Sequence, residues 1–396
     1  MNRSIPLPPH ILDLMSRMEH AGEEAYVVGG SLRDALLGIP PHDFDLAVSS
    51  VPELTAEILR DFRVIETGLK HGTVTVIAGG EPVEITTFRV DGDYTDARHP
   101  DGVTFTRRIE EDLSRRDFTV NAMAYHPTKG LCDPFGGQAD LEQGILRAVR
   151  EPTLRFSEDA LRIMRAFRFS AQLGFSIEEK TLAGIAKTKD GLARIAAERI
   201  ASEFLRLLCA REPEGALRQM IGYGVLPYVT GDYCPSERIL TLLPQSRPCE
   251  EERLGLFFCE AEPEQTAEIL SSLKLSNKQK TACRAVCRAA HTAVKSEVDA
   301  RRLIADCGVY APFGVRVSAL LGVSPKEAVA WVEENRSPCT LSQLAVGGRE
   351  LIAAGMEPRR IGETLEWLLT QVLEDPTKNR RELLLSLSQA YNKERP

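Results

Sequence analysis

A change of residue pattern near Glu151 determines which architecture this chain can adopt. Before that point, helical stretches and turns alternate with short β-rich runs, at residues 25–28, 44–48, 73–77 and 83–88. After it, strand patterns almost vanish and apolar residues recur at the 3.6-residue period of helices. Clear examples are residues 159–173, 197–208 and 365–372. The pattern predicts an α+β fold, with a mixed sheet and helices in the first part and an all-helical remainder.

The chain of 396 residues is long enough for two to four domains. Clusters of turn-forming residues mark breaks at residues 211–215, 244–251, 260–263 and 335–338. From these breaks and the pattern change we expect four parts. They are a head (1–146), a helical neck (147–212), a helical body (213–335) and a helical tail (336–396).

The charge balance excludes one class of partner surface. Lys and Arg number 49 against 57 Asp and Glu, a formal net charge of -8. A globally basic nucleic-acid-binding surface is therefore excluded, although local basic stripes remain possible. No apolar run approaches the roughly 20 residues that span a bilayer, and the N-terminus lacks an apolar signal core. Nine cysteines without a C-x-x-C pair are typical of reduced thiols, so we expect a cytoplasmic protein without a membrane segment.

A strand that runs into Gly29-Gly30 and then into a short helix suggests a ligand loop. Two glycines let the backbone approach a ligand closely, and a helix start presents unpaired N–H groups to phosphate. Arg33, one turn into the helix, can add a charge-assisted contact to a phosphoryl oxygen. No G-K-[ST] follows, so this is not a Walker loop. Taken alone, a plain tight turn explains the glycines equally well.

The segment Asp43-Phe44-Asp45 adds a second chemical signal. In a strand, residues i and i+2 point to the same face, so both carboxylates project together while Phe44 points into the core. Adjacent carboxylates repel unless a cation compensates, and oxygen ligands of this kind suit Mg²⁺. Two such ions can clamp the attacking and leaving oxygens of a phosphoryl transfer. The alternative is a solvated strand end without a metal.

The combination of G-G-x-x-R-D (residues 29–34) and D-x-D (residues 43–45) resembles a known signature. It is similar to that of the polymerase-β-like nucleotidyltransferase superfamily, in the branch that contains bacterial CCA-adding enzymes and poly(A) polymerases. Residues 84–89 resemble the second strand motif of this branch, and residues 111–122 resemble its R-R-D-F-T-x-N-A element. The resemblance implies a nucleotidyltransferase head followed by a helical neck, body and tail.

The resemblance also implies roles for individual residues. Asp43 and Asp45 are the expected catalytic residues and would bind Mg²⁺. The triphosphate is expected on the glycine turn and on two arginines, which are Gly29, Gly30, Arg33 and Arg116. Arg115 is the alternative to Arg116 for this role. Glu84 is a less favoured candidate for a third carboxylate at the metal.

Residues 156–169 predict an amphipathic helix with a polar face. Apolar residues such as Ile163 and Phe167 fall on one side, while the polar arc carries Asp159, Arg162, Arg165 and Arg168. Salt links between neighbouring turns are the plain explanation of such an arc. The resemblance implies more. Asp159 would accept a hydrogen bond from the exocyclic amine of cytosine or adenine, Arg162 would donate to the ring acceptors, and Arg165 and Arg168 would hold phosphates.

Three other segments match the same branch. The loop at residues 90–102 resembles a loop that is kept in enzymes that add the terminal A. Residues 197–204 resemble a neck helix, for which we expect a structural role, because Ile200 and Phe204 form a core stripe. Softer matches at residues 273–278, 344–351 and 357–362 extend the resemblance into the body and tail. Cations there could follow an RNA backbone, although solvated helix faces explain them equally well.

The sequence therefore predicts a template-independent RNA nucleotidyltransferase. The expected reaction adds C, C and A to the 3′ end of tRNA from CTP and ATP and releases pyrophosphate. A poly(A) polymerase, an A-only or a CC-only adding enzyme is the alternative within the enzyme class. From a different class, the chain could be a non-catalytic RNA-binding protein with this fold, although the intact Asp43 and Asp45 argue against it.

Overall fold

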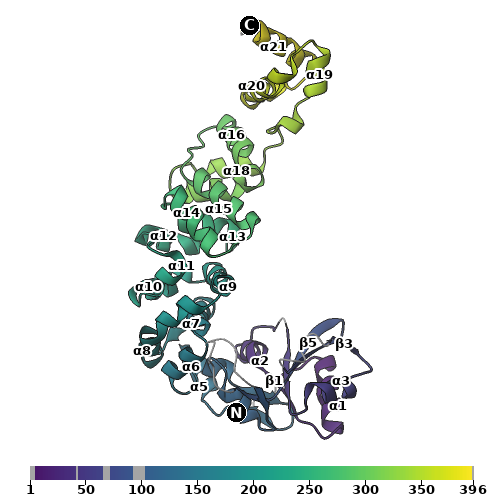
Figure 1. Cartoon of the computed structure of the whole chain (residues 1–396), viewed down its shortest axis with the longest axis vertical. Helices are drawn as coiled ribbons and strands as arrows, with labels where there is room; N and C mark the ends of the chain where they lie inside the picture. The colour runs from purple at the N-terminus through teal and green to yellow at the C-terminus, as the bar shows by residue number, and fades with distance from the viewer. Residues whose placement is uncertain (1–4, 42, 66–71, 92–102, 395–396) are drawn as a thin grey trace. The chain divides into compact units, whose positions relative to one another are not determined.

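The computed structural model describes residues 5–41, 43–65, 72–91 and 103–394 (Figure 1). The chain forms two compact units, residues 1–229 and residues 230–396. The first unit contains the sheets, with helices between and after their strands, whereas the described part of the second unit has helices and no strands. The predicted α+β fold is confirmed. The finer division into head, neck, body and tail stays a prediction.

The first unit is built on a mixed sheet of seven strands, in the order β3-β4-β5-β2-β1-β8-β9. These strands are β1 (Ala25–Val28), β2 (Asp45–Val48), β3 (Arg63–Ile65), β4 (Thr73–Ala78), β5 (Glu81–Thr87), β8 (Ala124–His126) and β9 (Gly130–Cys132). Only β2 and β5 pair in parallel among these neighbours. Two small sheets accompany it, one of β6 (Arg89–Asp91) and β7 (Val103–Phe105), the other of β10 (Ile145–Leu146) and β11 (Ser176–Ile177).

Burial follows from the position of each strand. All four residues of β1 are buried, as expected for a central apolar strand, whereas β4 alternates between half-buried and buried residues. In β2 only the first residue, Asp45, is not fully buried. Asp45 is the direct neighbour of Glu84 in the parallel pairing of β2 with β5. The sheet register therefore brings two carboxylates side by side.

Helices of the first unit surround the sheet and continue beyond it. They are α1 (Pro9–His20), α2 (Gly29–Leu36), α3 (Pro52–Ile58), α4 (Ile109–Ser114), α5 (Gly137–Gln143), α6 (Pro152–Glu158), α7 (Leu161–Leu173), α8 (Glu179–Thr188), α9 (Ala197–Leu208), α10 (Pro213–Gly222) and α11 (Pro227–Thr230). Short 3₁₀ turns lie at η2 (Thr119–Asn121) and η3 (Lys189–Arg194). Helix α9 has the same bounds as the helical pattern predicted from the sequence.

The single helix predicted over residues 156–169 is wrong. The chain ends α6 at Glu158 and begins α7 at Leu161. Between them Asp159 adopts an extended backbone, with φ -142° and ψ 102°. Its carboxylate Oδ1 accepts a hydrogen bond from the backbone N–H of Leu161 at 3.0 Å, as a helix-capping side chain does. The apolar period continues through the break, which is why the sequence pattern does not reveal it.

The second unit packs its helices around two groups of buried apolar residues, one within residues 285–332 and one within residues 344–384. Its helices are α12 (Glu237–Leu242), α13 (Glu250–Phe258), α14 (Pro263–Ser272), α15 (Asn277–Ala290), α16 (Glu297–Cys307), α17 (Ala311–Leu320), α18 (Glu327–Glu333), α19 (Gly348–Ala353), α20 (Ile361–Glu374) and α21 (Arg381–Glu394). Its 3₁₀ turns are η4 (Leu243–Gln245), η5 (Gly308–Tyr310), η6 (Leu341–Gln343), η7 (Pro358–Arg360) and η8 (Pro376–Lys378).

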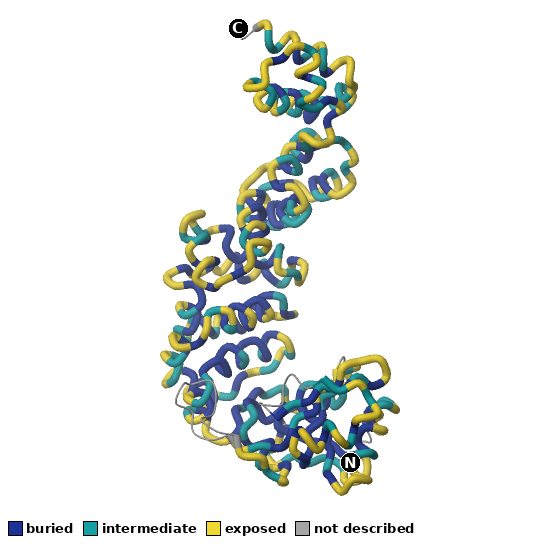
Figure 2. The backbone as a smooth tube through the Cα atoms, turned by 45° about the vertical axis from the view of Figure 1, so that its right-hand side comes forward, coloured by how far each residue is buried: buried dark blue, intermediate teal, exposed yellow. Residues whose placement is uncertain are grey.

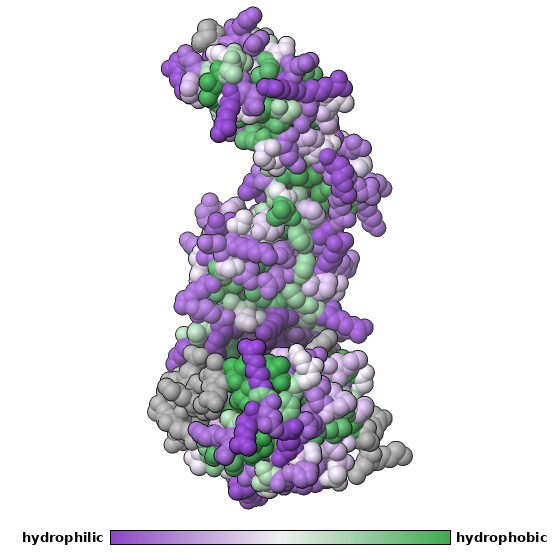
Figure 3. All heavy atoms as spheres, turned by 90° about the vertical axis from the view of Figure 1, so that its right-hand side faces the viewer, coloured by the Kyte–Doolittle hydropathy of each residue, from purple (hydrophilic) through white to green (hydrophobic). Residues whose placement is uncertain are grey.

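The helices of the second unit are amphipathic, with one side buried in the core and the other exposed. Buried and exposed stretches alternate along its helices (Figure 2). On the face that Figure 3 shows, hydrophilic side chains cover most of this unit and hydrophobic ones form small separate groups. The pattern agrees with the 3.6-residue period that the sequence shows after residue 151.

One stretch of the described chain, Glu297–Leu320, is long and apolar enough to cross a membrane by length and composition alone. It is not one helix, because α16 ends at Cys307 and Gly308 has a positive φ of 55° before α17 begins. Leu303 and Val315, one from each helix, belong to the same buried core. We therefore interpret the stretch as two core helices of the second unit.

Glycines permit the close approach of neighbouring helices in this core. A β-carbon at Gly255 of α13 would overlap the side chain of Val286 in α15. One at Gly314 of α17 would overlap the Cβ of Ala289, also in α15. The spacing between α15 and its two neighbours therefore depends on the missing side chains.

We predict that Gly314→Ala lowers the free energy of unfolding of the second unit. The added methyl group forces α15 and α17 apart, which costs roughly 1–3 kcal/mol in a well-packed core. Urea unfolding monitored by circular dichroism measures the change.

Gly362→Ala is the matched control, because a β-carbon at this position in α20 meets no atom within 4 Å. There the higher helix propensity of alanine gives no loss of stability and a gain of up to about 1 kcal/mol. Equal loss in both variants would show that Gly314 does not set the helix spacing.

Candidate active site

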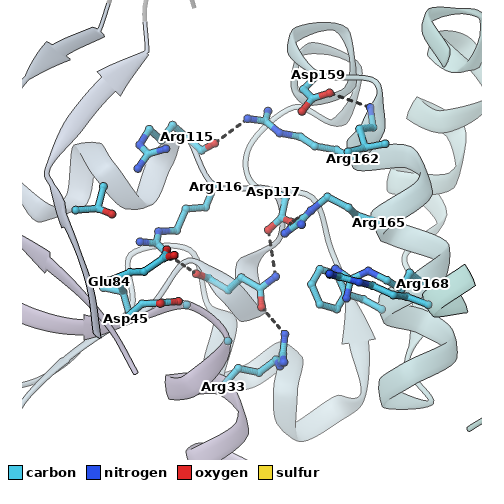
Figure 4. A pocket seen from close by; sticks show the side chains of 18 of the residues that line it. Arg33, Asp45, Glu84, Arg115, Arg116, Asp117, Asp159, Arg162, Arg165 and Arg168 are labelled. Carbon is cyan, nitrogen blue, oxygen red and sulfur yellow. Dashed lines mark hydrogen bonds and ion pairs between the residues drawn. The ribbon is translucent and has the colours of Figure 1, made fainter. Parts of the chain in front are cut away.

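A polar cavity of about 680 Å³ opens in the first unit. Its walls come from β1, α2, β2 and β5 of the sheet region, from the segment around Arg116, and from helices α7 and α9. Nine of the ten site residues predicted from the sequence line this cavity, namely Gly29, Gly30, Arg33, Asp45, Arg116, Asp159, Arg162, Arg165 and Arg168. Segments far apart in the sequence therefore meet at one site. Figure 4 shows the sheet residues and the arginines of α7 on opposite sides of the cavity.

The tenth predicted residue, Asp43, lies two residues before β2 and is exposed. It does not line the cavity, but its charge acts on Asp45. Phe44, between them, was expected to point into the core, but it is only half-buried. The strict alternation expected of a strand fails here because β2 begins at Asp45, and Asp43 precedes the regular pairing.

Asp45 and Glu84 form a carboxylate pair at the edge of the cavity (Figure 4). The pKa of Asp45 is raised above its usual value, first by burial and then by the negative charge of Glu84. Arg116 opposes the rise, and Asp43 adds to it. The negative charges of these carboxylates therefore repel one another, and a bound cation would relieve the repulsion.

The donors suit a hard divalent cation. Asp43, Asp45 and Glu84 are all carboxylates, and Mg²⁺ and similar ions prefer oxygen ligands of this kind. The described residues contain no ready-made cluster of three or more His, Cys, Asp or Glu side chains at metal-binding geometry. Hard divalent ions often take one or two protein carboxylates and complete their shell with water and substrate phosphates. The carboxylates present here fit that arrangement.

Gly29 brings the backbone close to both charged walls of the cavity. It has a positive φ of 76°, which favours glycine, and it starts helix α2 directly after β1. A β-carbon at Gly29 would lie 3.4 Å from Asp45 Oδ2 and 3.4 Å from Arg116 Nη1. A side chain would therefore fill space between the carboxylate and the guanidinium, at the point where unpaired helix N–H groups also lie.

The guanidinium of Arg116 makes only long contacts within the part of the protein that the structure describes. Its Nη2 lies 3.3 Å from Asp112 and its Nη1 lies 3.4 Å from the carbonyl oxygen of Asn121. Its buried Nε has no hydrogen-bond partner among the described residues. Arg115, by contrast, holds Asp112 with shorter contacts, of 3.0 Å from Nε and 2.8 Å from Nη2. The geometry therefore favours Arg116 over Arg115 as the residue free to bind an anion.

Arg33 is buried and oriented by the protein. It contacts Asp34 at 2.7 Å, and its Nη1 donates to Asn121 Oδ1 at 2.9 Å. Asn121 in turn donates from Nδ2 to Asp117 Oδ1 at 3.1 Å. This hydrogen-bonded series connects the glycine loop with the segment that carries Arg116.

Asp159 stands at the other end of the cavity and has two protein partners. While Oδ1 caps α7, Oδ2 accepts from Arg199 Nη2 of α9 at 2.9 Å. Arg162 is similarly held, because Nη1 donates to Glu158 Oε2 at 2.6 Å and Nη2 to the carbonyl oxygen of Arg115 at 3.1 Å. Both side chains are thus fixed in place beside the cavity (Figure 4).

Arg165 and Arg168 are held by carboxylates from other elements. Arg165 Nε donates to Asp117 Oδ2 at 2.8 Å, and Arg168 pairs with Glu203 of α9. The guanidinium carbon of Arg168 lies 3.9 Å from the ring centre of Phe169, and that of Arg165 lies 5.2 Å away. Cation–π contact thus supplements the ion pairs.

The contribution of α9 to the site was not predicted from the sequence. Arg199 and Arg206 line the cavity, and Glu203 holds Arg168. The buried stripe of Ile200 and Phe204 is present as expected. The missed signal was the spacing of Arg199, Glu203 and Arg206 at i, i+4 and i+7, which puts them on one helix face.

The loop at residues 90–102, which resembles a loop kept in enzymes that add the terminal A, lies mostly outside the described residues, at 92–102.

Comparisons with known proteins agree with this geometry. Residues 25–147 match a family model described as the poly A polymerase head domain, and residues 174–231 match a probable RNA and SrmB-binding site of polymerase A. A CCA-adding enzyme of Latilactobacillus sakei is 36% identical over 94% of this chain and 96% of its own length. One of Pediococcus pentosaceus is 36% identical over 96% of each chain.

A solved structure gives the same result. The crystal structure of the Bacillus stearothermophilus CCA-adding enzyme in complex with CTP has a TM-score of 0.83 and 31% identity, and the match covers 98% of this chain and 99% of that one. A polymerase-type head with paired carboxylates beside an arginine-lined cavity defines a nucleotidyltransferase. The chain belongs to the family of CCA-adding enzymes. Membership in this family of nucleotidyltransferases indicates a requirement for a divalent metal ion.

We predict that Asp117→Asn destabilises the first unit at neutral pH. Burial alone would raise the pKa of Asp117, but Arg165 and hydrogen bonds from Asn121 and the Phe118 N–H lower it to about 2. A depressed folded-state pKa means that the ionised group stabilises the fold above the usual value of 3.8, and that this contribution is lost as pH falls toward 2. It amounts to roughly 2 kcal/mol.

Urea unfolding of wild type and variant at pH 7, 4 and 3 tests this. The difference in unfolding free energy should shrink as the pH falls below about 4, because Asn cannot titrate. Asp61→Asn is the control, since Asp61 forms an exposed ion pair with Arg17 and contributes about 0–1 kcal/mol. A difference that stays constant across this range would contradict the role assigned to Asp117.

Proposed function

We propose that this chain adds C, C and A to the 3′ end of tRNA, using CTP and ATP and releasing pyrophosphate. The observation that carries the proposal is the meeting of two groups in one cavity. The carboxylate pair of β2 and β5 lies on one side, and Asp159 and Arg162 lie on the other. The family relationship over nearly the whole chain supports the same reaction.

The carboxylates and the glycine loop act on the phosphates. Asp43 and Asp45 hold Mg²⁺, which when bound activates the 3′-hydroxyl and stabilises the leaving group. The glycine loop (Gly29 and Gly30) admits the triphosphate close to the backbone N–H groups of α2. Arg33 and Arg116 donate to its oxygens, because Arg116 Nη1 and Arg33 Nη2 lie beside Gly29 and Gly30. Arg165 and Arg168 extend the cationic wall along the same cavity.

Asp159 and Arg162 select the base without a nucleic-acid template. The carboxylate of Asp159 accepts from the exocyclic amine of cytosine or adenine, and Arg162 donates to a ring acceptor. Uracil and guanine present a carbonyl oxygen where that amine lies, so the carboxylate repels them. Because Arg199 and the start of α7 fix Asp159, the base meets a preorganised acceptor.

The partners follow from the reaction. ATP and CTP enter the cavity, and tRNA presents its 3′ end there. No membrane partner is needed, and the nine free cysteines suit a reducing compartment, so we place the enzyme in the cytoplasm. Contacts from the helical second unit to tRNA read its shape and phosphates rather than its sequence.

Primer extension on a tRNA that ends before CCA tests the proposed function. We expect two C residues with CTP alone, little extension with ATP alone, the full CCA with both, and no product after EDTA until Mg²⁺ is restored. Asp45→Ala should abolish transfer, because it removes the partly buried carboxylate beside Gly29. Products are resolved on a sequencing gel.

The same assay separates the alternatives. A poly(A) polymerase or an A-only enzyme would leave CTP unused, a CC-only enzyme would stop after two residues, and a non-catalytic RNA-binding protein would extend nothing. Asp13→Asn is a matched control, because Asp13 forms an exposed ion pair on α1 outside the cavity. Full activity of Asp45→Ala would refute the proposed metal site.

We predict that Asp159→Asn shifts base preference toward UTP. The Asn oxygen still accepts from the Leu161 N–H, while its amide nitrogen replaces the oxygen that accepts from Arg199 and offers a donor to the carbonyl oxygen of uracil. The ratio of kcat/KM for CTP to that for UTP should fall by roughly 5–150-fold, the equivalent of about 1–3 kcal/mol. Single-nucleotide incorporation with each triphosphate measures this ratio, and an unchanged ratio would remove Asp159 from base selection.

A further inference from the structure

Helix α9 forms a polar wall of the cavity through one of its faces. Arg199, Glu203 and Arg206 lie four and three residues apart, and Arg199 and Arg206 line the cavity directly. From the start of α9 onward, Arg199 contacts Asp159 and Glu203 contacts Arg168. Arg206 lies one turn further along, at the end of this wall that is away from Asp159.

Charge pairing distinguishes Arg206 from the other arginines of the cavity. Eight arginines line it, and seven of them have a carboxylate within ion-pair distance. The pairs are Arg33–Asp34, Arg115–Asp112, Arg116–Asp112, Arg162–Glu158, Arg165–Asp117, Arg168–Glu203 and Arg199–Asp159. For Arg206 the described part of the chain supplies no such partner. The exposed guanidinium of Arg206 therefore keeps its charge and all five donors for a ligand.

The position of Arg206 identifies its ligand as a phosphate rather than a base. Seven residues separate it from Arg199, which corresponds to about 10 Å along the helix axis. Arg206 is therefore far from Asp159, the carboxylate that faces the base. An unpaired guanidinium at the rim of a polar cavity is suited to a phosphate oxygen, which it can contact with two parallel donors.

We propose that Arg206 binds a backbone phosphate of the RNA 3′ end as the strand enters the cavity. This inference rests on the proposed function and adds an RNA contact on α9. The RNA is favoured over the nucleoside triphosphate for two reasons. Arg116 and Arg33 lie beside Gly29 and Gly30, where the triphosphate is expected, and both are less exposed than Arg206. Arg206 is exposed, as expected for a contact to an RNA strand of which most stays outside the cavity.

Steady-state kinetics of Arg206→Ala test the proposal. The variant should raise KM for tRNA by roughly fivefold, as loss of one exposed charge contact does, while KM for CTP stays at the wild-type value. The slope of log affinity for tRNA against log salt concentration should fall by about 0.7–0.9, since one phosphate contact is lost. Arg206→Lys, which retains the charge, should restore most of the affinity and the salt slope.

Arg211→Ala is the matched control. Arg211 is 87% exposed, follows α9 directly, and does not line the cavity, so its loss should leave KM for tRNA unchanged. An Arg206→Ala variant that raises KM for CTP instead assigns the residue to the triphosphate and overturns the proposal. An unchanged KM for tRNA with an unchanged salt slope also overturns it. Either result leaves the proposed function intact, which fails only if wild type does not extend tRNA.

Discussion

The candidate active site depends on the pairing of seven of the eight arginines that line its cavity with carboxylates from the protein. Guanidinium groups brought together in a partly buried space repel one another and lose hydration. The pKa of Arg168 is lowered by burial and by the charge of Arg165, against the opposing effect of Glu203. Buried carboxylates such as Asp112 and Asp117 offset this cost and fix the side chains. The paired arginine side chains are therefore held in place by the protein itself.

The pairs also connect elements that are distant in the sequence. Asp117 belongs to the segment after α4, Arg165 to α7, and Glu203 to α9. The packing of α7 against α9 thus also holds the side chains of the site in position. In the same way, the parallel register of β2 and β5 places Asp45 beside Glu84 without any local sequence signal that they are neighbours. Site geometry here is a direct result of tertiary packing.

Much of the fold was predictable because period-2 and period-3.6 patterns report which face of an element is buried. The strands β1, β2, β4 and β5 and the helix α9 follow those patterns closely. The break at Asp159 was not predictable, since one extended residue leaves the apolar period of α7 intact. The candidate site residues came from a resemblance to a family, and the structure brings nearly all of them to one cavity. The partners of those residues, Arg199 above all, depend on contacts that no local pattern encodes.

The two hydrogen bonds of Asp159 have an evolutionary consequence. The carboxylate begins helix α7 and anchors Arg199, and it also faces the space where a base is expected. A mutation that changed this residue to an apolar one would weaken the helix start and leave a guanidinium without its anchor. Folding by itself therefore constrains which residues this codon can encode.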